Sequence, residues 1–317
     1  MTGLALDEHR DGGTRVYSPG TTEVVYRRIL KSVTVFVVLF FGYFFIQVIQ
    51  SSFLGFQTAG LKFFTDSLWN FPNLVSIWPL VAGTLVTSAL ALLIAIPLGI
   101  AASIVIAFVL PYYLRTTVIT VVGMLAVIPS IIYGVWGLTF LVRWSSYTAE
   151  PWLSKTFHGA WPFSGIPRGS GILVGSIVLA VMVLPTIVAV TVDVFNGLPK
   201  DIFEGSYALG ATKAQVIRKT ILPASRTGII GACTFALARA MGETVALATV
   251  LGGTQLSHYP NSLLAEGSTL ASTIVSAFGG GFGSETSELY CLGVFLLVLI
   301  FAISLIARRM VKENVTT

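Results

Sequence analysis

One uninterrupted apolar run, from roughly Ile77 to Leu110, constrains what this chain can fold into more than any other feature. At about 35 residues it is longer than one straight helical crossing of a ~30 Å hydrocarbon core requires. A run of this kind is suited to a lipid bilayer. We expect Pro97 and Gly99 to break or kink it, so that its inner end lies along the membrane surface or protrudes.

The rest of the chain is also rich in apolar residues. Of its 317 residues, 55% are hydrophobic and 10% are charged, whereas a soluble domain carries about 25% charged residues. The sequence therefore predicts an all-α polytopic membrane protein with six transmembrane helices. The other five spans are expected at roughly 29–49, 117–142, 171–192, 227–251 and 288–307. Residues 50–75, 143–170 and 252–287 read as loops, although a re-entrant element within 268–283 is the alternative to a flexible segment.

The apolar run at 29–49 is the first in the chain. It is expected to remain in the mature chain, because no small-residue cleavage site follows it. This gives a cytoplasmic arm at 1–28, a transmembrane permease domain at 29–307 with a polar loop at about 199–223, and a cytoplasmic tail at 308–317. Cys233 and Cys291 lie inside apolar runs and are expected to be buried and unpaired.

Lysine and arginine residues are distributed unevenly between the two sides of the membrane. With the N-terminus in the cytoplasm, 14 of the 19 fall on the inside, four fall in outer loops, and Arg239 lies within a span. Because cytoplasmic loops are enriched in these residues, both termini and the 193–226 loop are predicted to be cytoplasmic. The outer four are Lys62, Arg143, Lys155 and Arg168.

The polar loop between the fourth and fifth spans has helical spacing from Asp201 to Thr220, and Gly210 divides it. Leu-Pro pairs punctuate it at 198–199 and 222–223. We expect two short helices hinged at Gly210. From spacing alone, an ordinary amphipathic linker at the membrane surface is an equally good interpretation.

The motif in this loop resembles the coupling loop of ABC importer permeases. The residues assigned to this coupling loop are Glu204, Gly205, Ser206, Ala208, Gly210, Ala211, Leu222 and Pro223. It departs from that family's pattern where Gly205 and Ser206 replace two alanines and where Thr220 replaces isoleucine. The resemblance implies a type I importer permease fold and docking on a separate ATPase subunit. The chain has no Gly-Lys dipeptide and hence no Walker phosphate loop, so ATP and Mg would be bound by that partner.

A second feature is a pair of charges, Arg239 and Glu243, inside the fifth predicted span. On a continuous helix they would share one face, one turn apart. A charge in the bilayer interior is costly, so both are expected to face the protein interior. One interpretation is an ion pair that only fixes helix packing. The other is a substrate pathway, in which the guanidinium binds an oxyanion and the carboxylate prevents it from binding too tightly.

Several segments resemble the C-subunit permeases (PstC) of Pst-type phosphate importers. They are RAMGETVA at 239–246, IPSIIYGVWG at 128–137, IVLAVMVLP at 177–185 and YALGAT at 207–212. The resemblance covers residues 75–250. It implies a non-catalytic, multi-pass subunit of the bacterial inner membrane that imports inorganic phosphate. The implied partners are a sister permease, PstA, two copies of the ATPase PstB, and the phosphate-binding protein PstS.

Two other classes of function remain open. A permease for another oxyanion, such as sulfate or molybdate, would have a similar coupling loop, although the segment at 239–246 argues against it. A secondary transporter driven by an ion gradient would show inverted repeats with broken spans, and no such pair is evident. An enzyme is the weakest alternative because no nucleophile and base cluster appears.

Overall fold

The computed structural model describes residues 21–60, 62–65, 69–70, 76–164, 166, 168–251, 256–257, 261–278 and 284–313. It divides into two compact units, residues 1–47 and 48–317. The described part of the first unit is the beginning of α1 (Thr21–Ala59). The described residues are nearly all helical, with one antiparallel pair of two-residue strands, β1 (Trp69–Asn70) and β2 (Leu256–Ser257).

Among the described residues, four helices are long and apolar enough to cross a membrane: residues 23–57 of α1, residues 78–109, α8 (Ile172–Asn196) and residues 286–307 of α15 (Ser284–Glu313). The second of these consists of α3 (Trp78–Ile104) and a π-helical turn, η1 (Val105–Val109). Two bent helix pairs, at 112–156 and 213–241, complete a set of six when each pair is counted as one span. The prediction of a helical, polytopic membrane chain is thereby confirmed for the described residues, and the predicted six spans are the upper count of the candidates.

The remaining elements are shorter and fall mostly within the bent pairs. They are α2 (Lys62–Thr65), α4 (Tyr112–Val127), α5 (Ser130–Trp136), η2 (Gly137–Leu141), α6 (Val142–Trp144), η3 (Ser145–Ala149), α7 (Glu150–Thr156), α9 (Lys200–Ala208), α10 (Lys213–Val216), η4 (Ile217–Ile221), α11 (Leu222–Ala224), α12 (Arg226–Met241), α13 (Val245–Leu251) and α14 (Leu270–Phe278).

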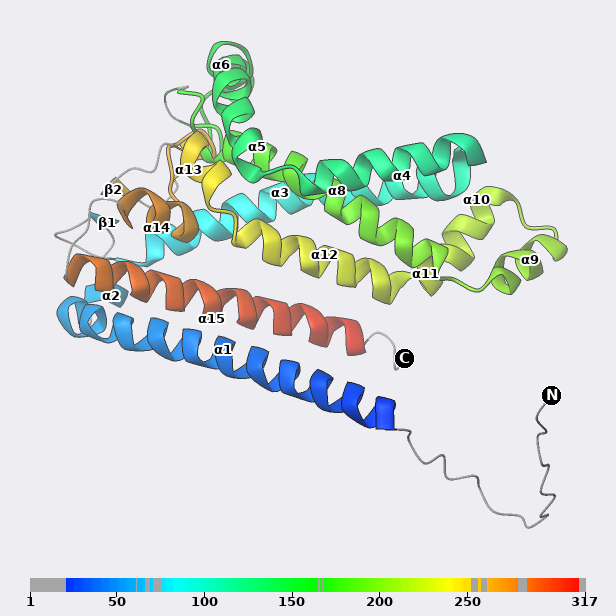
Figure 1. Cartoon of the computed structure of the whole chain (residues 1–317). Coiled ribbons are helices and arrows are strands. Elements are labelled where there is room, and N and C mark those ends of the chain that lie inside the picture. The colour runs from blue at the N-terminus through cyan, green and yellow to red at the C-terminus, as the bar shows by residue number, and fades with distance from the viewer. Residues whose placement is uncertain are drawn as a thin grey trace. The chain divides into compact units, whose positions relative to one another are not determined.

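The core of the second unit is centred on α8, which packs along α3 and α12 (Figure 1). Gly99 of α3 permits the close approach, since a Cβ atom there would lie 2.7 Å from Cγ2 of Ile187. Ser103 reinforces it by donating to the carbonyl oxygen of Val188 at 3.3 Å. The elements α9–α11 and α5–α7 lie toward opposite ends of this bundle (Figure 1).

Of the expected break or kink at Pro97, the break does not occur, because α3 continues through this residue to Ile104. Proline removes one backbone hydrogen bond, but a full break in a membrane helix would leave several backbone groups unsatisfied. The helix instead widens after Ile104, into the π-helical turn η1.

The span predicted over 117–142 is not one continuous helix. The chain bends by 87° between α4 and the helical run 130–156. Ile128 and Pro129 have extended backbone angles at the bend, because the proline ring disfavours a helical conformation for the residue before it.

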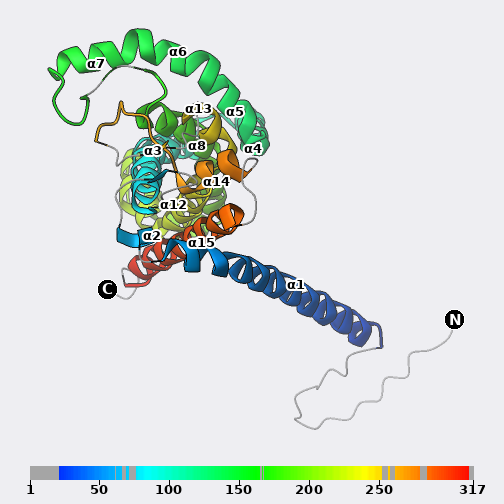
Figure 2. The same ribbon diagram turned by 90° about the vertical axis from the view of Figure 1, so that its left-hand side faces the viewer.

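Three predicted loops contain helices. Residues 143–156 continue the run that begins at α5, which Figure 2 shows as one curved succession of α5, α6 and α7. Residues 50–59 belong to α1, and α14 lies within the segment predicted as the outer loop 252–287. Both cysteines are free as expected, and the buried Cys291 thiol donates to the carbonyl oxygen of Ser52 at 3.0 Å.

Candidate functional site

The polar loop after α8 forms two short helical segments, α9 and α10–α11, as the sequence predicts. Gly210 separates them with a φ of +80°, a left-handed conformation that glycine adopts without steric cost. Thr212 then starts α10 with a capping box, in which its hydroxyl accepts from the Gln215 amide and Gln215 Oε1 accepts from the Thr212 amide.

Ser206 and Thr220 join the two halves of the loop. Their hydroxyl oxygens lie 3.1 Å apart, and Ser206 also donates to the carbonyl oxygen of Ile202 at 2.9 Å. Ser206 and Thr220 are two of the positions at which the loop departs from the Ala-Ala and Ile residues of the motif. The structure therefore shows that these two departures are in contact, a pairing that spacing did not indicate.

The inner face of the loop is attached to the membrane helices through aromatic contacts. The Phe108 ring, at the end of the long span, lies 6.1 Å from the Phe203 ring and 5.3 Å from the Phe195 ring, measured between centroids. Buried Val216 and Ile221 belong to the same apolar cluster. Helix α9 is thus in contact with the ends of η1 and α8.

The opposite face of the loop is open. Glu204, Gly205, Ala208, Gly210 and Pro223 are exposed, while Ser206, Ala211 and Leu222 are partly buried. Beside them Leu209 is 90% exposed. This face of the loop is therefore accessible at the surface of the chain.

The two charges of the fifth predicted span do not lie on one helix. Helix α12 ends at Met241, Gly242 is its C-cap, and a new helix, α13, begins at Val245. Glycine is a poor helix former, and the Glu243 carboxylate caps the second helix by accepting from the Ala246 amide at 3.1 Å. The expectation of a shared helix face is therefore wrong, and no Arg239–Glu243 ion pair occurs among the described residues.

Arg239 contacts the other helix break instead. Its Nη2 donates to the carbonyl oxygen of Ala126 at 3.3 Å, and the Tyr133 hydroxyl donates to that of Leu125 at 2.9 Å. The last carbonyls of a helix lack intrahelical partners and carry the negative end of its dipole. Arg239 and Tyr133 together satisfy the C-terminal end of α4 where the chain bends at 128–129.

The segments that follow the two breaks also pack together. A Cβ atom on Gly134 of α5 would lie 2.9 Å from the Cα atom of Ala246 in α13. Two interrupted helices therefore meet, one at 128–129 and the other at 242–244. The sequence indicated the importance of Arg239 and Glu243, but it did not indicate the contribution of Ala126 or Tyr133. The Ile128-Pro129 pair was the available signal for the first break.

The guanidinium of Arg239 has donors to spare at this position. It carries five N–H groups, and its one hydrogen bond within the described part of the chain is the contact with Ala126. It is only partly buried. A cation with a planar set of free donors at a helix break can bind the oxygens of a small anion.

A hollow of about 540 Å³ lies at the same break, on the surface of α4. Thr120, Gly123, Met124, Val127 and Ile128 line it. None of the residues of α4 is buried within the chain, although the helix belongs to a membrane-spanning segment. This face is therefore available to lipid or to another membrane protein.

Proteins with known names match almost the whole chain. The chain is 36% identical over 319 residues to the Phosphate transport system permease protein PstC of Mesorhizobium japonicum, a match that covers 98% of this chain and 95% of that protein. It is 35% identical to the protein of the same name from Pasteurella multocida, with 92% of each chain covered.

A solved structure, of a bacterial ABC transporter involved in the import of the acidic polysaccharide alginate, has the same fold. Its TM-score is 0.61 at 17% sequence identity, and the match covers 92% of this chain and 95% of that one. The type I ABC importer permease fold is thus confirmed. The family model for binding-protein-dependent transport system inner membrane components matches residues 61–316. The chain belongs to the family of binding-protein-dependent transport system inner membrane components.

Proposed function

We propose that this chain is a permease subunit of an ATP-driven importer of inorganic phosphate. The observation that carries the proposal is the match, over nearly the full length of both chains, to two permeases named for phosphate transport. The family and the long apolar helices make the chain a multi-pass protein of a bacterial inner membrane. Its role is transport and not catalysis.

The substrate passes the two helix breaks. Arg239 presents its free donors there, and phosphate offers oxygens that a guanidinium binds in a planar, two-point geometry. Interrupted helices that line a cavity are a general way to build ion sites inside membranes. Glu243 supplies a negative charge on the neighbouring break, which limits how tightly the anion is held.

The sister permease PstA completes the path by packing against this chain. The unburied face of α4 and the hollow beside Val127 and Ile128 support that arrangement. The binding protein PstS delivers phosphate to the outer side. With the termini and the 193–226 loop in the cytoplasm, the two copies of the ATPase PstB lie at the inner side.

The ATPase docks on the exposed face of α9, around Glu204, Gly205 and Leu209. ATP and Mg are bound by that subunit, whose closure on ATP displaces α9. Phe203 lies directly before Glu204 and contacts Phe108, so the displacement reaches η1 and α8 through the aromatic contacts. Arg239 is then accessible from the cytoplasmic side of the membrane and no longer from the outer side.

Uptake of labelled phosphate by vesicles that contain the complete transporter tests this function. We expect Arg239→Gln to lower ATP-dependent uptake by roughly tenfold or more, because hydrogen bonds to charged groups contribute about 1.5–3 kcal/mol. Assembly with the partner subunits and ATPase activity are measured in the same preparation. Arg143→Gln, which removes an exposed cation from the α6 segment, is the matched control and should leave uptake unchanged.

Two outcomes would contradict the proposal. Uptake of sulfate in place of phosphate by the unmodified transporter would make the substrate assignment wrong. Unchanged phosphate uptake by Arg239→Gln would remove the arginine from the path. If the variant failed to assemble, Arg239 would be structurally required, and the substrate assignment would rest on the phosphate permeases that the chain resembles.

A further inference from the structure

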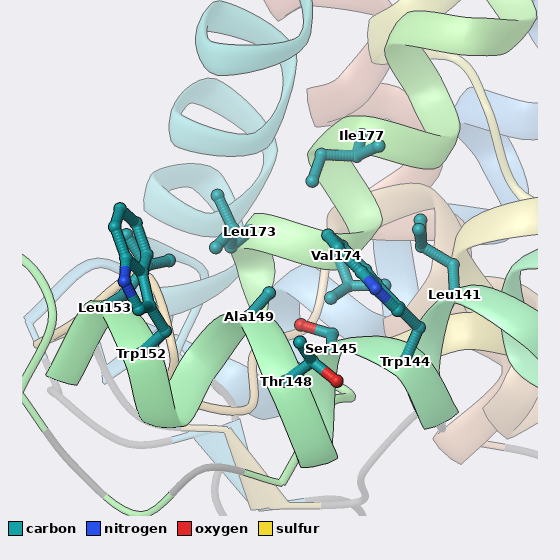
Figure 3. A pocket seen from close by; sticks show the side chains of 10 residues that line it. All are labelled: Leu141, Trp144, Ser145, Thr148, Ala149, Trp152, Leu153, Leu173, Val174 and Ile177. Atoms are coloured by element: carbon teal, nitrogen blue, oxygen red, sulfur yellow. The ribbon is translucent and has the colours of Figure 1, made fainter. Parts of the chain in front are cut away.

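A groove of about 440 Å³ lies between the helical run η2–α7 and the first two turns of α8 (Figure 3). Leu173, Val174 and Ile177 of α8 form one wall. The groove is separate from the two helix breaks and from the α9–α11 loop. Its volume is within the ~300–1,000 Å³ range of small-molecule binding sites.

The groove is elongated along the η2–α7 run. Trp144 and Trp152 stand at its two ends, and the small side chains of Ser145, Thr148 and Ala149 lie between them (Figure 3). Eight residues of helix separate the two tryptophans, or about 12 Å at 1.5 Å per residue. The groove therefore suits a narrow, extended, apolar ligand.

The wall opposite α8 is held in place by a buried carboxylate. Glu150 is 0% exposed and accepts from Ser145 Oγ at 3.2 Å and from the Gly169 amide at 2.9 Å. Gly169 packs so closely that a Cβ atom there would lie 2.3 Å from the Val142 carbonyl oxygen. The groove is thus built into the fold, and the Ser145 hydroxyl on its floor is already occupied.

The groove lies near one end of the membrane-spanning helix α8. Helix α8 is one of the four long spans and begins at Ile172, so Leu173 to Ile177 lie at the end of that span, away from the α9–α11 loop. Trp144 and Trp152 are 47% and 64% exposed, and tryptophan is enriched at the boundary between lipid tails and headgroups.

A positively charged side chain lies on the same face of the helix as Trp152. Lys155 follows Trp152 by three residues on α7, which places both side chains on one side. Lys155 is exposed, and the part of the chain that the structure describes contains no ion pair for it. The Trp152 end of the groove therefore lies next to an exposed positive charge.

We propose that this groove binds one acyl chain of an anionic phospholipid, whose phosphate interacts with Lys155. The apolar walls accept the hydrocarbon chain, and the two tryptophans bracket it at the depth of the upper acyl region. The ammonium of Lys155 selects a negatively charged headgroup over a zwitterionic one. This site is independent of the proposed phosphate path, so either proposal can fail without the other.

Photo-cross-linking tests the occupant. The assembled transporter is placed in vesicles of phosphatidylethanolamine and phosphatidylglycerol with a trace of phosphatidylglycerol that carries a diazirine on one acyl chain, and the adducts are mapped by mass spectrometry. We expect them to concentrate on 141–153 and 173–177 and to disappear from these segments in Ala149→Phe, which fills the floor. Thr139→Phe, outside the groove on the same helical run, should retain them.

Lys155→Gln tests the headgroup at an exposed position where folding is not disturbed. Because one lysine near an anionic surface changes affinity by about fivefold, adducts from the labelled phosphatidylglycerol should fall by about that factor. Those from labelled phosphatidylethanolamine should not change, and Arg143→Gln should have no effect on either. Equal adducts in Ala149→Phe and the parent, or lipid adducts on a partner subunit in place of 141–153 and 173–177, would overturn the proposal.

Discussion

The Ser206–Thr220 contact replaces an alanine and isoleucine pair of the family motif with two hydroxyl groups. Each hydroxyl is partly buried and uses the other as a partner. We expect Ser206→Ala to destabilise the loop by about 1 kcal/mol, because the half-buried Thr220 hydroxyl then loses its partner. Thr220→Ile should cost less, because Ser206 keeps its hydrogen bond to the Ile202 carbonyl oxygen. The double variant should recover most of this loss. Thermal unfolding of the solubilised complex measures these changes in stability. If the losses of the two single variants were additive in the double variant, the contact would have no energetic role.

Glu243 allows its charge to be separated from its structural contact. Its carboxylate accepts from the Ala246 amide at the start of α13, and a glutamine retains an oxygen that can do the same. We expect Glu243→Gln to preserve stability and to slow phosphate release, whereas Glu243→Ala should destabilise α13 by about 1 kcal/mol through loss of a cap. Thermal unfolding and single-turnover uptake distinguish the two. Equal unfolding temperatures for both variants would contradict the capping role.

At the scale of elements, the hinge between α9 and α10 depends on one glycine. Gly210 has a φ of +80°, which costs a residue with a Cβ atom roughly 1–2 kcal/mol. We expect Gly210→Ala to tilt the two helices and to lower uptake without preventing membrane insertion. Gly205→Ala is the matched control, since its Cβ atom would meet no atom within 4 Å and the motif has alanine there. Loss of uptake in both variants would locate the effect in the docking surface and not in the hinge.

The two interrupted spans were only partly predictable. Proline at position 129 is a local signal for a bend, yet its size of 87° depends on how α5 packs against α13. Pro97 gives the same local signal and produces no break. The difference lies in the neighbours, because α3 is packed along α8 through Gly99 and Ser103 over the same region.

At the scale of the whole molecule, the orientation in the membrane remains a prediction from the distribution of Lys and Arg. Lys213 in α10 should be cytoplasmic, and Lys155 in α7 should face outward. In intact cells a membrane-impermeant maleimide should therefore label Lys155→Cys and leave Lys213→Cys unlabelled until the membrane is opened. The parent protein, with Cys233 and Cys291 inside helices, is the background control. The reverse labelling would invert the topology and place the α9–α11 loop where no ATPase could reach it.

The sequence by itself determined the membrane class, the four long spans and the two-helix loop hinged at Gly210. These features depend on the length and order of residues within one segment, and they need no information from elsewhere in the chain. Only the tertiary structure decided the partners of the charges. Arg239 contacts Ala126, 113 positions away, and not Glu243, four positions away. A hydrogen bond between distant segments depends on where two helices end and how they pack, and no local pattern encodes that geometry.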